Sequence, residues 1–457
     1  MQPNENPELI ERYEAMRCSG RSVYFDSDEF EEIIEFYELC DDEEAINVAI
    51  EDGLKLHPQN QSLLLKKAFY LTSKKEYAQA LSLANNFSGN SVDINIMLLK
   101  AEIFLHTDNL QSALSIFDII LEQAESELDF LDCVDILRSA NRNKEALEYA
   151  LKGKEQFFES LELSREIADI YYVLEDYDSA IRIYNEILDA DPYSSEDWTD
   201  LGDLYNLKGD YENAIEAFDF SLAIDESDER TLYLKSNSLI LNGNTQKAIE
   251  TLLEYSEIVK RDETAYILIS ECYSEMKEYE TAKYYAYKAL EVKPDSILSL
   301  RRMVYVLLDD DHFSESLMYL EMAIEQTPDE SDLHFLKADV LMSLNRFDDA
   351  EPEYLKALSI ASDPDEKIDI TYSLALLKQQ LEQHTEALTY FEKTADFRPD
   401  YPDLFLKMAV SYAGSERFDK ALIYLNKALI ESTAGHSPKE IEAREKTINE
   451  LKEILNI

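Results

Sequence analysis

The stretch SEDWTDLGDLYNLKGDYENAIEAFDFSLAIDESD, residues 195–228, decides the fold. Within it, Trp198, Leu201 and Tyr205 recur at spacings of three and four, which predicts one apolar stripe along a helix. Gly209 follows that stripe, where a turn between two helices often needs a positive φ that glycine adopts freely. The stretch therefore predicts two short helices joined by a tight turn.

Small side chains indicate where these two helices touch. Gly202 and Ala214 carry almost no side chain, so the two backbones can approach closely at these positions. A small residue that matches Ala214 returns along the chain in steps of 33 to 37 residues, most of them 34. So many returns at one period predict a repeat protein. We call these positions the register residues: Ala45, Ala80, Ala113, Ala146, Ala180, Ala214, Ala248, Ala282, Ser316, Ala350, Ala387 and Ala421.

Further marks keep the same register. A second small residue lies twelve positions before the register residue in most repeats, and aromatic rings recur three positions before it and four after it. Because most rings fall at such positions, we interpret them as core side chains and not as a stacking surface for nucleic-acid bases. Proline cannot continue a helix, and it closes several repeats twelve positions after the register residue: Pro192, Pro294, Pro328 and Pro399.

This pattern over residues 26–434 resembles the tetratricopeptide repeat (TPR), a helix-turn-helix unit of 34 residues. The resemblance implies an all-α, right-handed α-solenoid of about twelve such repeats. Ile33, Val134 and Val304 stand where a small residue is expected, which should affect local packing but not the fold. The step of 37 residues inserts three residues near 361–366, and we interpret the insertion as a longer loop.

Both ends of the chain are predicted to be caps. Residues 1–25 form an N-terminal cap with a short helix that ends at Gly20, and residues 26–434 form the solenoid. Residues 435–457 form a C-terminal capping helix, which begins at a capping box in residues 437–440. In this helix Ile441, Ile448, Leu451 and Leu455 form one apolar stripe and the rest is largely charged, so the helix would shield the open end of the stack.

The charge balance narrows the possible partners. The 457 residues include 43 Lys and Arg against 96 Asp and Glu, which gives a formal net charge of −53. Such a charge disfavours extended contact with nucleic-acid phosphates or an anionic membrane surface, and it attracts basic partners. It would also keep a long solenoid soluble, so acidity alone identifies no ligand. The sequence has no apolar run of 18 residues and is not expected to span a membrane.

The cysteines and the first residues bear on localisation. Cys18, Cys40, Cys133 and Cys272 are scattered and form no C-x-x-C pair, which suits a reducing compartment better than a disulfide framework. Residues 1–6 show neither a basic region nor an apolar core, so no signal peptide is expected. We predict a cytoplasmic protein.

The resemblance also implies a binding surface. In TPR proteins the first helix of each repeat lines a concave groove, which holds extended peptides or partner helices. The residue eleven positions before the register residue is then implied to face the groove, where carboxylates could accept backbone hydrogen bonds or pair with Lys and Arg. A solvated position that is typical of the family remains the alternative. The candidate groove residues are Glu102, Asp135, Asp169, Asp203, Asn237, Glu271 and Asp339.

Basic side chains near these positions are few. Arg138, Arg165, Arg230 and Arg301 stand alone, without the Lys and Asn set with which the family clamps a terminal carboxylate. We expect such arginines to pair with neighbouring carboxylates. A chaperone C-terminal tail is therefore a poor candidate ligand.

Motifs for catalysis are absent from the sequence. There is no phosphate-binding loop, no dinucleotide fingerprint, no H-E-x-x-H and no G-x-S-x-G, and no two of the six histidines lie at metal-ligand spacing. The run Asp309–Asp311 before His312 lacks the glycine of a calcium loop and reads as a solvated turn. We expect no enzyme activity, no cofactor and no metal.

Two functional hypotheses remain. The first is a protein-interaction scaffold or adaptor whose acidic groove binds a basic or extended peptide segment of a partner protein. The alternative is an acidic regulator that mimics the charge of nucleic acid and binds the basic face of a DNA- or RNA-binding protein. In both hypotheses the partner is a protein, and the oligomeric state stays open.

Overall fold

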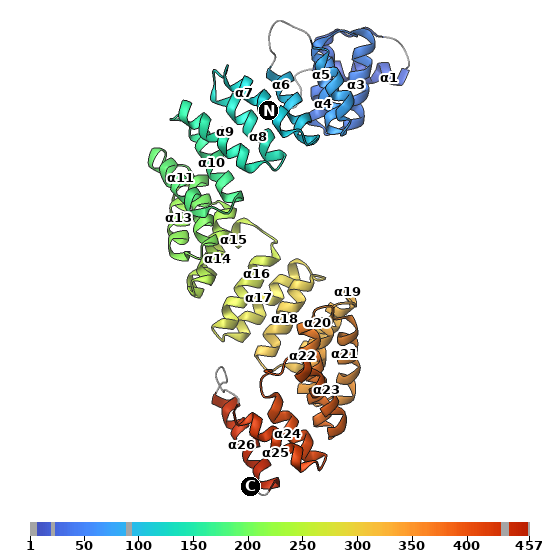
Figure 1. The fold of residues 1–457 in the computed structure, drawn as a ribbon, viewed down its shortest axis with the longest axis vertical. Coiled ribbons are helices and arrows are strands. Elements are labelled where there is room, and N and C mark those ends of the chain that lie inside the picture. The colour runs from blue at the N-terminus through green and yellow to red at the C-terminus, as the bar shows by residue number, and fades with distance from the viewer. Residues whose placement is uncertain (1–6, 20–22, 88–93, 431–437, 456–457) are drawn as a thin grey trace. The chain divides into compact units, whose positions relative to one another are not determined.

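The computed structural model describes residues 7–19, 23–87, 94–430 and 438–455, which form two compact units. No strand occurs in these ranges, and helices account for the secondary structure (Figure 1). Gly20 and Ser437, which the sequence suggested as boundaries of the terminal helices, lie outside the described residues. Unit 1, residues 1–224, holds α1 (Pro7–Ser19), α2 (Ser27–Leu39), α3 (Glu43–Leu56), α4 (Gln61–Ser73), α5 (Tyr77–Asn85), α6 (Ile94–His106), α7 (Leu110–Leu121), α8 (Glu127–Ser139), α9 (Asn143–Gln156), α10 (Leu161–Val173), α11 (Tyr177–Ala190), α12 (Ser195–Leu207) and α13 (Tyr211–Ile224).

Unit 2, residues 225–457, continues the same alternation of helices and short turns. It holds α14 (Glu229–Leu241), α15 (Thr245–Ile258), α16 (Glu263–Glu275), α17 (Tyr279–Val292), α18 (Ile297–Asp309), α19 (Phe313–Gln326), α20 (Ser331–Ser343), α21 (Phe347–Ile360), α22 (Pro364–Gln380), α23 (His384–Phe397), α24 (Leu404–Gly414), α25 (Phe418–Ala428) and α26 (Pro438–Ile454).

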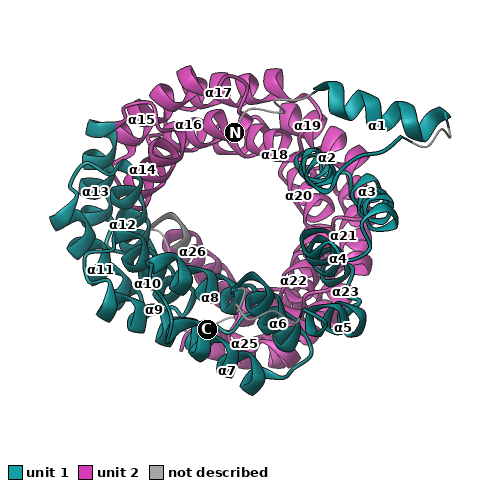
Figure 2. Ribbon diagram, turned by 90° about the horizontal axis from the view of Figure 1, so that it is seen from above, with its two compact units in different colours: residues 1–224 teal, residues 225–457 magenta. Residues whose placement is uncertain are grey.

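Helices α2 to α25 form twelve consecutive pairs, in which each even-numbered helix packs against the odd-numbered helix that follows it. Within each unit the even-numbered helices make an inner layer and the odd-numbered ones an outer layer (Figure 2). Helix α1 precedes the first pair and packs on α2, and α26 follows the last pair and packs on α24. The predicted all-α solenoid of about twelve helix pairs is confirmed, whereas the limits of the two caps stay predictions.

The register residues lie where the helices of a pair touch. All twelve are buried, with between 0 and 8% of their surface exposed. In the central pair, a Cβ added to Gly202 on α12 would lie 2.5 Å from Cε1 of Phe218 on α13, well inside van der Waals contact. The period in the sequence therefore records a spatial requirement for small side chains. Ile33, Val134 and Val304 are fully buried as well, so these repeats accommodate larger side chains at the second small position.

Each turn within a pair contains one residue in the left-handed region. Gly209 has a φ of +74° and Gly243 a φ of +73°, and in the other ten pairs a non-glycine residue takes the matching place. The residue with positive φ usually lies five positions before the register residue. The turn therefore keeps a fixed distance along the sequence from the close contact between the two helices. The prediction for Gly209 is confirmed. The non-glycine residues are Asp41, Lys75, Asp108, Asn141, Glu175, Lys277, Asp311, Asn345, Glu382 and Glu416.

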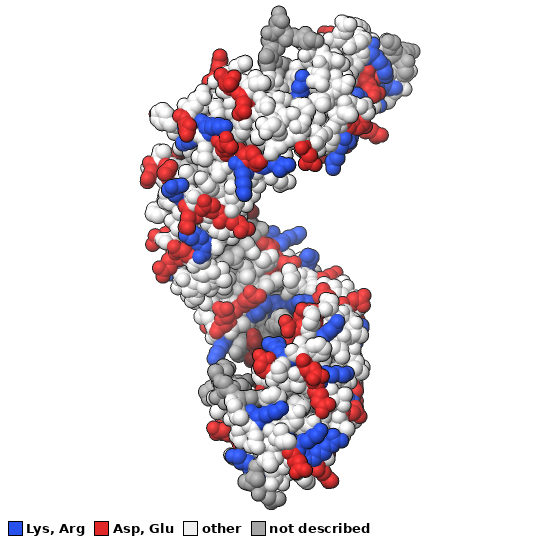
Figure 3. All heavy atoms as spheres, in the orientation of Figure 1, with Lys and Arg blue, Asp and Glu red and all other residues white. Residues whose placement is uncertain are grey.

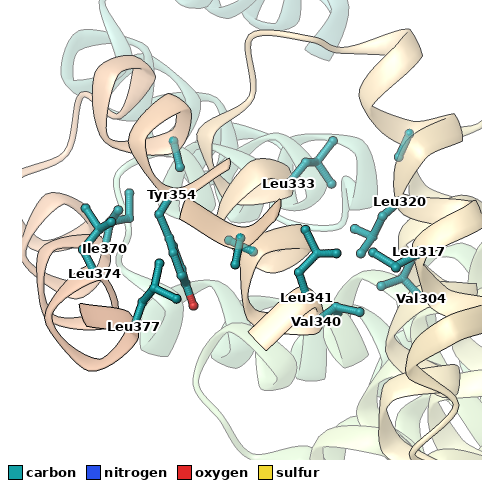
Figure 4. Close-up of a cluster of buried hydrophobic side chains, with 14 of the residues drawn as sticks. Val304, Leu317, Leu320, Leu333, Val340, Leu341, Tyr354, Ile370, Leu374 and Leu377 are labelled. Atoms are coloured by element: carbon teal, nitrogen blue, oxygen red, sulfur yellow. The ribbon is translucent and has the colours of Figure 1, made fainter. Parts of the chain in front are cut away.

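The core runs along each unit as a series of clusters between neighbouring pairs. One cluster in unit 2 joins α18 to α22, and in it Tyr354 of α21 extends among Ile370, Leu374 and Leu377 of α22 (Figure 4). Leu317, Leu320 and Val304 fill the other end of this cluster (Figure 4). Each pair buries its apolar faces only against its neighbours, which is how a solenoid is stabilised.

The prediction of a longer loop at residues 361–366 is wrong. Only residues 361–363 separate α21 from α22, and the inserted residues lengthen α22 to 17 residues where most even-numbered helices have 13. Pro364 begins the helix, and Asp363 caps it by accepting a hydrogen bond from the Glu366 backbone N–H at 3.0 Å. Proline is favoured in the first turn of a helix because its missing N–H would find no partner there anyway.

Candidate protein-binding surface

The seven candidate groove residues all lie on even-numbered helices, each directly after the second small position of its repeat or its equivalent. None is buried: Asp135 and Glu271 are exposed and the other five are partly exposed. Unit 1 contains Glu102 on α6, Asp135 on α8, Asp169 on α10 and Asp203 on α12; unit 2 contains Asn237 on α14, Glu271 on α16 and Asp339 on α20. Four candidates thus belong to unit 1 and three to unit 2.

In unit 1, Asp169 is the centre of a polar network. Its Oδ1 accepts a hydrogen bond of 3.0 Å from the Tyr184 hydroxyl, which also lies 3.3 Å from Oδ2 of Asp200 on α12. Nη2 of Arg138 lies 4.0 Å from Asp169 Oδ2, while the same guanidinium pairs closely with Glu166. Burial raises the pKa of Asp169, and the Tyr184 hydrogen bond and Arg138 offset only part of that rise.

The other end of this set is Glu102 on α6. Its Oε1 lies 3.9 Å from Nε2 of His106, one turn further along the helix. Burial raises the pKa of Glu102, and His106 partly lowers it. The carboxylate thus has a weak partner and a desolvated position, so its negative charge is incompletely compensated.

In unit 2, Asp339 and Glu271 show the same feature. Asp339 on α20 accepts a hydrogen bond from the hydroxyl of Tyr354, and burial raises the pKa of its carboxyl. Glu271 is exposed as a residue, but desolvation of its carboxyl by neighbouring groups raises the pKa, with Arg302 acting in the opposite direction. Arg302 itself is buried and donates to the Ser270 hydroxyl and backbone carbonyl at 2.8 Å each, so its hydrogen bonds go to α16 and not to the Glu271 carboxylate.

Three of the four arginines near these positions, Arg138, Arg165 and Arg301, pair with carboxylates of the following repeat, which confirms the expectation for these three. Arg165 on α10 makes two hydrogen bonds of 2.8 Å to Asp197 on α12, which is only 1% exposed. Arg301 on α18 pairs with Glu330 and with Asp332, the latter at 2.7 Å between Nη2 and Oδ2. These bridges neutralise the scattered cations and leave a surplus of carboxylates on the even-numbered helices.

The acidic partners of these arginines were not predicted from the sequence. A signal was present, because the arginine and its partner are separated by about one repeat, as 165 and 197 or 301 and 330 are. Side chains at such a spacing lie on neighbouring even-numbered helices. On the face drawn in Figure 3, acidic and basic side chains are likewise interspersed over both units.

Comparison with models of protein families identifies the repeat family to which these helix pairs belong. The model described as Tetratricopeptide repeat matches residues 134–195, 165–229 and 301–366. The chain is a TPR protein. A second model, described as Anaphase-promoting complex, cyclosome, subunit 3, matches residues 207–286 of this TPR protein.

Solved structures that match this chain include MamA, YrrB and the Cut9–Hcn1 hetero-tetramer of the APC/C. MamA shares 25% identity over 35% of this chain and 93% of its own, with a TM-score of 0.33. YrrB, described as a TPR protein with an unusual peptide-binding site, shares 14% identity over 41% of this chain and 96% of its own, with a TM-score of 0.34. The Cut9–Hcn1 hetero-tetramer of the APC/C gives 12% identity over 88% of this chain and 92% of that chain, with a TM-score of 0.39. No curated protein matches the sequence.

Among the residues that the structure describes, no three His, Cys, Asp or Glu side chains converge as a metal site would require. No helix within the described ranges is both long and apolar enough to cross a bilayer. TPR proteins are typically non-enzymatic scaffolds, and this fold serves protein–protein interaction in general.

Proposed function

We propose that this TPR protein is an interaction scaffold whose inner carboxylates bind a basic, extended peptide segment of a partner protein. The observation that carries the proposal is the raised pKa of Glu102 and Asp169 in unit 1 and of Asp339 in unit 2, three partly exposed carboxylates whose pKa is raised first by burial. A desolvated carboxylate destabilises the fold when it is ionised. Residues that a protein retains although they lower its stability are typical of binding sites.

A cationic ligand would relieve this cost. An incoming Lys or Arg side chain would stabilise the ionised carboxylates and lower their pKa, while the peptide backbone could donate N–H groups to carboxylate oxygens. The surplus of carboxylates that remains after Arg138 and Arg165 are paired supports this choice of ligand. The net charge of −53 adds long-range attraction, so association should slow as salt rises.

Unit 1 is the better place for a first test because four consecutive even-numbered helices carry a candidate carboxylate there. We would measure the binding of a fluorescein-labelled peptide of five Gly-Lys repeats by fluorescence anisotropy at low and moderate salt. The variant Glu102→Gln, Asp169→Asn, Asp203→Asn should bind about tenfold more weakly, if each removed charge contributes the roughly 0.2–1 kcal/mol of an exposed ion pair. Wild-type binding should strengthen between pH 4 and 7 as the carboxylates ionise.

A matched control separates the site from the overall charge. Glu148, Glu186 and Glu216 are exposed carboxylates on α9, α11 and α13 of the outer layer in the same unit. Their replacement by Gln changes the net charge by the same amount, and the peptide should bind this variant like the wild type. Equal binding by the wild type and the inner variant would refute the proposal. Weakened binding by the outer variant, together with competition by DNA for a basic partner, would favour the alternative of a nucleic-acid mimic.

We also propose that the protein works in a reducing compartment such as the cytoplasm. The four cysteines are unpaired, and Cys18 and Cys40 are exposed. Exposed free thiols are stable where the environment keeps them reduced.

A further inference from the structure

A pocket of about 190 Å³ opens between α22 and α23, on helices that carry none of the candidate groove residues. Its walls are mainly apolar and come from Pro364, Ile368 and Thr371 on α22 and from Thr394 and Phe397 on α23. Phe397 is 77% exposed, which is unusual for a phenylalanine. The first turn of α22, which the inserted residues provide, forms part of the wall through Pro364 and Lys367.

Other repeats show what this pocket lacks. In the central pair, Trp198 lies sixteen residues before the register residue and stacks on Phe220, six residues after it, with ring centroids 4.7 Å apart. At the same two positions, Nζ of Lys288 lies 5.5 Å from the ring centroid of Tyr266, and Nζ of Lys427 lies 5.0 Å from that of Phe405. A ring on the first helix therefore covers the residue on the second helix in each of these repeats.

The pair α22–α23 has Thr371 where those repeats have a ring, and Lys393 takes the position of Lys288 and Lys427. Lys393 lies instead over Tyr390 of its own helix, 5.3 Å from the ring centroid. Thr371 is much smaller than the rings of those three repeats, and it forms part of the wall of the open pocket. A volume of about 190 Å³ is enough for one aromatic side chain, since a cavity of roughly 150 Å³ can bind benzene.

The rim of the pocket is positively charged in a strongly acidic chain. Lys367 and Lys393 are both exposed, and neither has an ion pair within the part of the chain that the structure describes. Nearby carboxylates are engaged elsewhere, as Asp369 accepts a hydrogen bond of 2.9 Å from the Tyr401 hydroxyl. Asp365 lies 4.0 Å from Arg398. The two lysines can thus meet an anionic group from outside the chain.

We propose that this pocket binds a partner-protein segment in which an aromatic side chain is flanked by acidic residues. The ring of the partner occupies the place that Trp198 fills in the central repeat and contacts the Lys393 ammonium from its face. The flanking carboxylates pair with Lys367 and Lys393. This ligand has the opposite charge to the one proposed for the inner carboxylates, so the two sites can be tested independently.

The test uses the full chain and the peptide Ac-Gly-Asp-Trp-Asp-Gly-NH2 with a fluorinated indole, followed by fluorine NMR. Binding with a Kd on the order of 1 mM is expected for a single anchoring ring. The same peptide with Ala in place of Trp should bind at least about tenfold more weakly, and Lys-Trp-Lys in place of Asp-Trp-Asp should also lose affinity. No binding of the first peptide at about 5 mM would overturn the proposal.

Variants locate the site. Thr371→Trp supplies the missing ring from within the chain and should abolish binding, while thermal unfolding at or above the wild-type temperature shows that the variant is folded. The double variant Lys367→Gln, Lys393→Gln keeps the pocket and should weaken binding several-fold. Lys427→Gln changes the equivalent lysine in a repeat whose ring is present, and it should leave binding unchanged. Peptide binding that survives both Thr371→Trp and the double variant would refute the assignment.

Discussion

The contact between Gly202 and Phe218 makes the strongest prediction about the fold. In Gly202→Ala the new Cβ would lie 2.5, 2.7 and 2.9 Å from three atoms of the Phe218 ring, where carbon atoms normally stay about 3.5–4.0 Å apart. Phe218 is fully buried, so its ring cannot swing away into solvent. One of the two helices must shift.

The expected magnitude follows from two opposing effects. Overpacking a well-packed core costs about 1–3 kcal/mol. Alanine in place of glycine in a helix contributes about 1 kcal/mol in the other direction. Gly202→Ala should therefore destabilise the protein by about 1 kcal/mol. Phe218→Leu shortens the obstructing side chain, so the double variant should be more stable than the sum of the single effects by about 1–3 kcal/mol.

Urea unfolding followed by circular dichroism gives the global change, and hydrogen exchange of the α12 and α13 amides gives the local one. Gly209→Ala is the matched control. No atom lies within 4 Å of a Cβ built at Gly209, but its φ of +74° makes alanine costly there. This variant should be destabilised without any coupling to Phe218→Leu. Additive effects of Gly202→Ala and Phe218→Leu would refute the close-contact explanation of the repeat.

Two further predictions concern titrating groups. Burial raises the pKa of Asp339, so the folded state holds this proton more tightly than the unfolded state, and the contribution of the group to stability is lost as pH rises through the raised pKa. Asp339→Asn, which can still accept the Tyr354 hydrogen bond, should thus stabilise unit 2 by about 0.5–2 kcal/mol at pH 7 and by almost nothing below about pH 4, as measured by urea unfolding across this range; equal effects at both pH values would contradict the assignment. For the thiols, burial raises the pKa of Cys272 to about 12 and that of Cys133 further, while Cys18 and Cys40 are exposed. Titration with a disulfide reagent at pH 8 should modify two thiols quickly and two only after unfolding; four equally fast thiols would show that α8 or α16 opens readily.

Much of this architecture could be predicted from the sequence because each repeat carries its own constraint. The close approach at Ala214 admits only a small side chain, so the requirement is written at every repeat in the same register. The acidic candidates on the even-numbered helices could be placed by counting from that register. Their electrostatic state could not, because the raised pKa of Asp169 depends on the burial supplied by neighbouring helices and on Tyr184 and Arg138, which come from other helices.

The three residues inserted near Ala361 show what the repeat period alone cannot predict. A change of period reveals that residues were added but not whether a loop or a helix receives them, and here Pro364 and the Asp363 cap direct them into α22. The pocket beside Phe397 is a similar case. Thr371 differs from Trp198 in the sequence, but only the packed helices show that no other side chain fills the space.

The sequence by itself determined the helix pairs, their number and the places where their backbones touch, since these depend on contacts between residues close together in the chain. Only the tertiary structure decided which charges are paired, which carboxylates are desolvated and where a ring is missing. Such properties depend on side chains from neighbouring repeats, whose distances and burial are fixed by packing and not by spacing along the chain.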